Sequence, residues 1–78
     1  MTYNQLQSIL PNHEIHYIDD STEFLNENNI EINKFKNNEF ILFEYTIDYF
    51  PETIELLNKN NIKHSIHHDE LDLKYIII

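Results

Sequence analysis

The six residues LNENNI, at positions 25–30, occur again as LNKNNI at positions 57–62, an offset of 32 residues. Three further identities keep this offset, and they pair Glu23 with Glu55, Ile15 with Ile47 and Tyr17 with Tyr49. An internal repeat predicts that similar structural units follow one another along a chain. This repeat therefore predicts architecture, and it contains no residue pattern typical of a particular chemistry.

The length of 78 residues predicts a single domain covering residues 1–78. Hydrophobic residues make up 41% of the chain, which is enough for one core layer between helices and a sheet. The absence of cysteine excludes disulfides, thiolate metal ligands and a cysteine nucleophile. No run approaches the ~18 apolar residues of a membrane span, and residues 1–5 lack the start of a signal peptide. We therefore expect a soluble protein of the cytoplasm.

Amino acids encoded by GC-rich codons are missing, since the chain has no Gly, Ala, Val, Arg, Cys or Trp. This bias is typical of very AT-rich genomes, which are common in phages, other viruses and mobile elements and occur in some cellular organisms. It explains the many Asn residues but not the charge, because lysine codons are also AT-rich. The chain has 14 Asp and Glu residues against five Lys, a formal net charge of −9. This charge argues against direct nucleic-acid binding and favours a basic protein surface as partner, inside a host cell.

Hydrophobic periodicity and helix-ending residues divide the chain into eight expected elements. Thr2 and Gln5 have the spacing of a capping box at the start of the first helix, and Pro11 ends it. Asn28 and Asn29 end the second helix, because Asn is the best residue after Gly for a left-handed C-cap. The expected helices lie at 1–12, 20–29 and 51–60, and the expected strands at 13–19, 30–36, 39–47, 62–68 and 71–78.

After the first helix the expected order is β-α-β-β-α-β-β, and its first six elements match the split β-α-β, or ferredoxin-like, arrangement. The repeat supports this fold, which consists of two β-α-β halves, here residues 13–46 and 46–78. The strand at 39–47 is apolar on both faces, so we place it centrally. We expect an α+β sandwich whose antiparallel sheet carries two helices on one face. The N-terminal helix is an addition to that fold, and the last strand is added at an edge.

No residue pattern predicts catalysis. Without Gly there is no P-loop or dinucleotide-binding fingerprint, and without Arg there is no bidentate phosphate clamp. His64, His67 and His68 lie beside Asp69 and Glu70. On a strand only His64 and His68 share a face, so exposed polar histidines are expected rather than a zinc site. We expect no enzyme activity, no cofactor and no intrinsic metal.

An acidic face is expected on the second helix, because Asp20, Glu23 and Glu27 fall at i, i+3 and i+7. Asp19 precedes them and Glu31 follows, and we predict that these five residues bind the partner. The alternative is a solvated helix face, on which acidic residues favour the helix N-terminus. That alternative explains Asp20 and Glu23 near the first turn of the helix, but it gives no structural reason for Glu27.

The second copy of the repeat differs at this face, where Lys59 replaces Glu27. Glu55 and Lys59 have a favourable i, i+4 spacing worth ~0.2–0.5 kcal/mol, whereas Glu23 and Glu27 repel by a similar amount. So small a cost is easily tolerated. The difference between the copies indicates that the acidic face serves binding.

Two functions of different class remain open. The first is an inhibitor that imitates nucleic acid and occupies the basic groove of a nuclease, CRISPR or restriction enzyme, as anti-CRISPR, anti-restriction and nuclease immunity proteins do as classes. The second is an assembly module, a possible homodimer, whose apolar sheet edge around Tyr75 and Ile77 pairs with another chain. In the second case the acidity confers only solubility.

Overall fold

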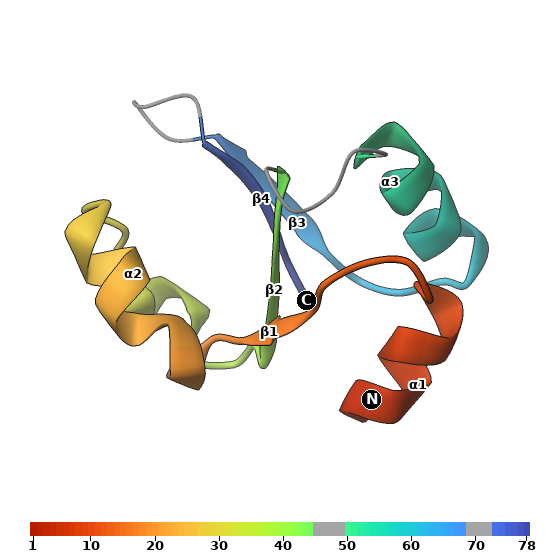
Figure 1. Ribbon diagram of the computed structural model, residues 1–78, viewed down its shortest axis with the longest axis horizontal. Coiled ribbons are helices and arrows are strands. Elements are labelled where there is room, and N and C mark those ends of the chain that lie inside the picture. Colours follow the sequence, from red (N-terminus) through yellow and green to blue (C-terminus); the bar gives the residue numbers. More distant parts are fainter. Residues whose placement is uncertain (45–49, 69–72) are drawn as a thin grey trace.

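The computed structural model describes residues 1–44, 50–68 and 73–78 of the chain (Figure 1). Within these ranges the chain is α+β, with three α-helices and a sheet of four antiparallel strands. The elements are α1 (Tyr3–Ile9), β1 (His16–Tyr17), the 3-10 helix η1 (Asp19–Ser21), α2 (Thr22–Glu27), the 3-10 helix η2 (Ile32–Phe35), β2 (Phe40–Phe43), α3 (Phe50–Lys59), β3 (Ser65–His68) and β4 (Lys74–Ile77). In the described part of the chain, none of the helices is both long and apolar enough to span a membrane.

The N-terminal helix α1 begins at the predicted capping box. The Gln5 amide N–H donates to Thr2 Oγ1 at 3.2 Å, and the Thr2 amide N–H donates to Gln5 Oε1 at 2.8 Å. These bonds satisfy two backbone donors that the first helical turn leaves unpaired. The helix buries Leu6 completely, which fixes the side that faces the sheet.

The sheet has the strand order β1-β2-β4-β3, and each neighbouring pair is antiparallel. In the inner pair Ile41 lies opposite Ile77 and Leu42 lies opposite Ile76. Every residue of β2 is buried, which confirms that this part of the strand expected at 39–47 is central and apolar on both faces; residues 45–47 lie outside the described residues. Successive residues of a strand point to opposite faces, so β2 and β4 supply apolar side chains to two separate cores.

Helices cover both faces of the sheet (Figure 1). On one face, residues of α1 and α3 pack on Phe40, Leu42 and Ile76. On the other face, residues of α2 and η2 pack on Ile41, Phe43 and Ile77, among others. The molecule therefore has three layers, with the sheet in the middle.

The expectation of two helices on one face of the sheet is wrong, since α2 and α3 lie on opposite faces. The physical reason is the apolar character of β2 and β4 on both faces. A sheet of this kind exposes a hydrophobic face to water unless each face is covered.

The ferredoxin-like topology is not confirmed, and the strand order is not the one of that fold. The strand expected at 30–36 is instead the 3-10 helix η2, because only Ile30 and Phe35 of that segment are buried and their spacing does not suit a strand. The last strand is also not at an edge. Strand β4 pairs with β2 on one side and β3 on the other, so β3 and β1 are the outer strands.

The sequence repeat encodes two identical helix ends. Asn29 and Asn61 have φ angles of 58° and 56°, in the left-handed region, which confirms the C-cap prediction at Asn29 and shows the same conformation at Asn61. The amide of the following isoleucine donates at 2.9 Å to the carbonyl of the leucine five residues earlier, Ile30 to Leu25 and Ile62 to Leu57. This is the Schellman motif, and each isoleucine packs in the same hydrophobic cluster as its leucine.

The Schellman motifs predict how substitutions at Asn29 and Asn61 change stability. A Cβ without a polar group is unfavourable at positive φ, so Asn29→Ala and Asn61→Ala should each lower the free energy of unfolding by about 1 kcal/mol. Asn29→Gly and Asn61→Gly should be neutral or slightly stabilising, since Gly adopts this conformation without strain. Urea denaturation of the four variants measures this. Equal stability of the Ala and Gly variants would contradict it.

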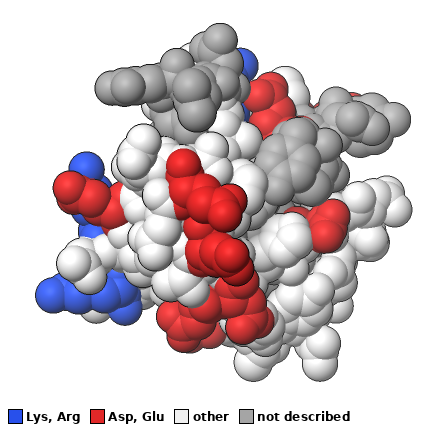
Figure 2. Space-filling model, turned by 60° about the vertical axis from the view of Figure 1, so that its left-hand side comes forward, with Lys and Arg blue, Asp and Glu red and all other residues white. Residues whose placement is uncertain are grey.

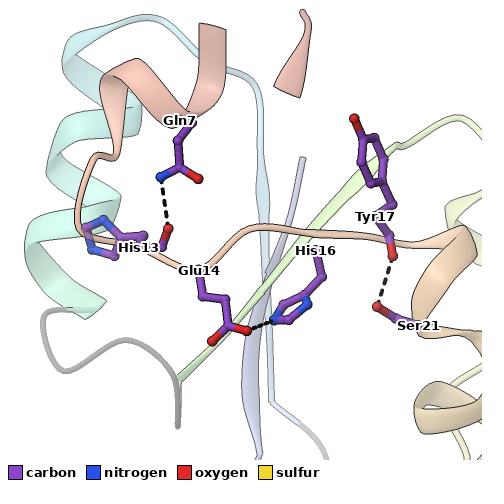
Figure 3. Close-up of polar contacts among 6 residues, drawn as sticks. All are labelled: Gln7, His13, Glu14, His16, Tyr17 and Ser21. Atoms are coloured by element: carbon purple, nitrogen blue, oxygen red, sulfur yellow. Dashed lines mark hydrogen bonds and ion pairs between the residues drawn. The ribbon is translucent and has the colours of Figure 1, made fainter. Parts of the chain in front are cut away.

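His13 joins the α1–β1 connection to α3. Its Nε2 atom lies 2.6 Å from the hydroxyl of Thr53, a fully buried residue of α3. The His13 carbonyl accepts a hydrogen bond of 3.0 Å from Gln7 Nε2 of α1 (Figure 3). Its Nδ1 atom is buried and has no hydrogen-bond partner in the described part of the chain. Burial lowers the pKa of His13, because a charged ring is poorly solvated here. The nearby Glu52 carboxylate partly opposes this shift.

The lowered pKa of His13 predicts a loss of stability in mild acid. Because the pKa is lower in the folded protein, the unfolded chain takes up a proton first as the pH falls below about 6.5. The free energy of unfolding should therefore be highest above that pH and should decline as the pH falls below it. Burial also lowers the pKa of His67, which acts in the same direction. His13→Gln should reduce the slope without abolishing it, as measured by urea denaturation at several pH values. An unchanged slope in His13→Gln would show that residues other than His13 cause the acid sensitivity.

Candidate interaction surface

The turn from β1 into α2 is built by two side-chain hydroxyls. Ser21 Oγ donates to the Tyr17 carbonyl at 2.9 Å (Figure 3), and Thr22 Oγ1 donates to the Asp19 carbonyl at 2.8 Å. Ser21 is the N-cap of α2, and its side chain makes no capping bond. The structure does not use the Asp20 carboxylate to begin the helix, so Asp20 stays exposed on the surface.

The orientation of α2 follows from two apolar residues. Leu25 is completely buried, and the Phe24 ring packs edge-on against the Phe43 ring of β2, with the ring centroids 4.8 Å apart. These contacts fix one side of α2 against the sheet. The opposite side therefore faces solvent, and Glu23 and Glu27 are exposed on it.

Four carboxylates form what we call the α2 acidic face, defined as Asp19, Asp20, Glu23 and Glu27. All four residues are exposed. All five Lys of the chain lie within the described ranges, and no ion pair there joins any of them to these four carboxylates. Figure 2 shows acidic side chains running in a continuous line over this side of the molecule, with basic side chains to one side. The α2 acidic face therefore carries four negative charges that the described residues leave without a basic partner.

Glu31, the fifth predicted residue, is placed differently. It is the N-cap of η2, and its carboxylate lies 3.9 Å from Lys34 Nζ. Both side chains are largely exposed, and surface pairs of this kind contribute at most about 1 kcal/mol. The structure thus gathers four of the five predicted residues on η1 and α2, and gives Glu31 a basic neighbour on the next element.

The corresponding helix surface in the other repeat copy lies across the sheet. Glu55 and Lys59 are exposed on α3 with the expected i, i+4 spacing, but no ion pair joins them among the described residues. Their opposite charges still reduce the local negative charge of α3. The two copies therefore present helix surfaces of different charge on opposite faces of the sheet.

The C-terminal histidines lie on or beside the outer strand β3. His64 Nδ1 is 2.8 Å from the Ile62 carbonyl, and His67 Nε2 is 2.8 Å from Ser65 Oγ. The His67 ring stacks on Tyr75 at 5.1 Å between centroids. The described residues contain no group of three or more potential ligands placed to hold a metal ion, and Asp69 and Glu70 lie outside the described residues. The histidine contacts that the structure does describe are hydrogen bonds and ring packing within the sheet.

The apolar edge predicted around Tyr75 and Ile77 is not at the surface. These residues are 6% and 0% exposed, and β4 is paired on both sides. The exposed large hydrophobic residues of the two outer strands are Tyr17 of β1, which is 41% exposed, and Ile66 of β3, which is 51% exposed. Sequence reasoning missed Ile66, because it considered only the histidines of the strand expected at 62–68. The apolar residue between His64 and His68 was the available signal.

Carboxylates in the described residues do not form a buried acid–base pair. Glu44, which directly follows β2, is partly exposed and lies 3.7 Å from Lys74 Nζ. General acid catalysis by a carboxyl group at neutral pH requires burial that raises its pKa. The strongest chemical feature in the described part of the chain is therefore the arrangement of surface charge.

The α2 acidic face and the exposed Ile66 of β3 lie on different elements of the fold. Comparisons with known proteins found no protein family, no curated protein and no solved structure that matches this chain.

Proposed function

We propose that this chain is a non-enzymatic inhibitor that binds the basic surface of a nucleic-acid enzyme through the α2 acidic face. The enzyme would be of nuclease, CRISPR or restriction type, and the carboxylates would occupy the groove that normally holds DNA or RNA phosphates. The protein would act without a cofactor in the cytoplasm of a host cell, as a product of a phage, another virus or a mobile element.

The observation that carries this proposal is the density of unpaired charge on η1 and α2. Glu23 and Glu27 lie on α2, where a rise of 1.5 Å per residue separates them by about 6 Å along the axis, and Asp19 and Asp20 lie on the preceding 3-10 helix η1. The four carboxylates thus follow one another at separations of the same order as the ~3.4 Å per charge of one DNA strand. A basic groove shaped for a nucleic-acid strand would therefore meet a similar charge spacing. The net charge of −9 would also speed its approach.

The rigid attachment of α2 also supports the proposal. The helix is held by the fully buried Leu25 and by the Phe24–Phe43 ring contact, so its carboxylates do not depend on a loop for their position. Preorganised surfaces lose less conformational entropy when they bind. Tyr75 and Ile77 are buried, so they do not provide the exposed apolar edge that the assembly alternative requires.

The repeat provides a matched pair of variants to test the proposal. Glu23 and Glu55 occupy the same repeat position and are both exposed, but they lie on helices on opposite sides of the sheet. We expect Glu23→Lys to weaken the complex with a basic partner by about tenfold or more at low salt, mostly through slower association. Glu55→Lys makes the same charge change on α3 and should alter affinity by less than about threefold.

Glu27→Lys should also weaken binding while keeping or slightly raising stability, and Glu23→Lys with Glu27→Lys should weaken it further.

The measurement starts with a pull-down from a host lysate, using the wild-type chain as bait and the double variant as control. A nucleic-acid enzyme recovered by the wild-type chain only is the expected result. Its binding kinetics are then measured for each variant at two salt concentrations, because screening should reduce a charge-driven association rate. Equal binding of all the variants by the recovered partner would overturn the proposal.

A further inference from the structure

Within the described ranges, the outer strand β3 pairs with one strand only, β4. Phe40 and Ile78 exchange reciprocal backbone hydrogen bonds of 3.0 and 2.9 Å between β2 and the end of the chain. Backbone groups alternate in direction along an antiparallel strand, so Ile77 and Tyr75 direct theirs toward β3. Their register partners on β3 are Ser65 and His67. The N–H and C=O of Ile66 therefore point outward, and no other strand in the described ranges pairs with that edge.

The stretch of sequence that leads into this edge contains no acidic residue. Residues 56–68 contain no carboxylate, and their charged or titratable residues are Lys59, Lys63 and three histidines. The opposite edge of the sheet, β1, has only two residues and lies between Glu14 and Asp19. Two copies of a chain with a net charge of −9 repel each other wherever carboxylates face carboxylates. Acidic residues flank β1 on both sides in the sequence, whereas they flank β3 on the C-terminal side only, beginning at Asp69.

We propose that β3 pairs antiparallel with β3 of a second copy, about a two-fold axis that passes beside Ile66. In this register each Ile66 lies opposite Ile66 of the second copy. The N–H of each Ile66 then donates to the C=O of the other. The two sheets join into one sheet of eight strands, and two half-exposed isoleucines are removed from water. The proposal is independent of the inhibitory function, since the α2 acidic face is not part of the contact.

Free strand edges are often protected from such pairing by charge, proline or short length. In β3 the exposed central position is an isoleucine, and the residues beside it are histidines and a serine rather than carboxylates. The strand has four residues, so the contact is smaller than the roughly 1,000 Å² of stable complexes. We therefore expect weak, reversible association that depends on concentration.

Sedimentation equilibrium of the purified chain tests the proposal, over concentrations from about 10 μM to 1 mM. The mass should rise from 9.5 kDa toward twice that value. Added salt should favour the dimer, because it screens the repulsion between two anionic copies. A mass of 9.5 kDa at every concentration and salt level would overturn the proposal.

Two substitutions at Ile66 separate strand pairing from other contacts. Ile66→Glu places carboxylates directly opposite each other and should weaken the dimer at least about tenfold. Ile66→Pro removes the outward N–H, which β4 does not use, and should weaken it similarly while the monomer stays folded by circular dichroism. Asn26→Glu adds the same charge on exposed α2 and should leave dimerisation within about threefold of wild type. A dimer that survives Ile66→Glu, or one that survives Ile66→Pro in a folded protein, would contradict pairing through this edge.

Discussion

The fold depends on two inner strands that are apolar on both faces. All four residues of β2 and three of the four in β4 are buried, and their side chains alternate between two hydrophobic clusters. Burial of apolar surface is the main force that favours folding. With 78 residues the chain can cover both faces only with short elements, and it does so with α1 and α3 on one face and α2 and η2 on the other. The three-layer arrangement follows from this requirement.

The repeat supplies each face with a helix that ends in the same way. The Schellman ends at Asn29 and Asn61 bring Ile30 and Ile62 back onto the leucines that anchor their helices, on opposite sides of the sheet. The repeated residues explain this common geometry, and Lys59 in place of Glu27 explains why the exposed surfaces differ in charge. The acidic face and the β3 edge thus belong to different elements, so a partner and a second copy could bind at separate surfaces.

Local features were predictable from the sequence, and their assembly was only partly so. The capping box of Thr2, the left-handed Asn29 and the doubly apolar strand β2 are all present in the structure. The strand order and the helix faces depend on contacts between distant residues, which local periodicity does not encode. The apolar pattern of β2 nevertheless implied helices on both faces, so this part of the prediction could have been correct. The carboxylates of the acidic face followed from helical spacing, whereas the exposure of Ile66 required knowing that β3 is an outer strand.

The double-sided core is tested most directly by truncating Ile76 and Ile77, neighbouring residues of β4 that are both fully buried but belong to different clusters. Ile76→Val and Ile77→Val remove the same methylene group from opposite faces of the sheet. The three-layer fold predicts that each lowers the free energy of unfolding in urea by about 0.5–1.5 kcal/mol. Ile66→Val, at a half-exposed position, should change it by less than about 0.5 kcal/mol. If only one of the two buried substitutions lowered stability, the sheet would have a single covered face, which would contradict the three-layer fold.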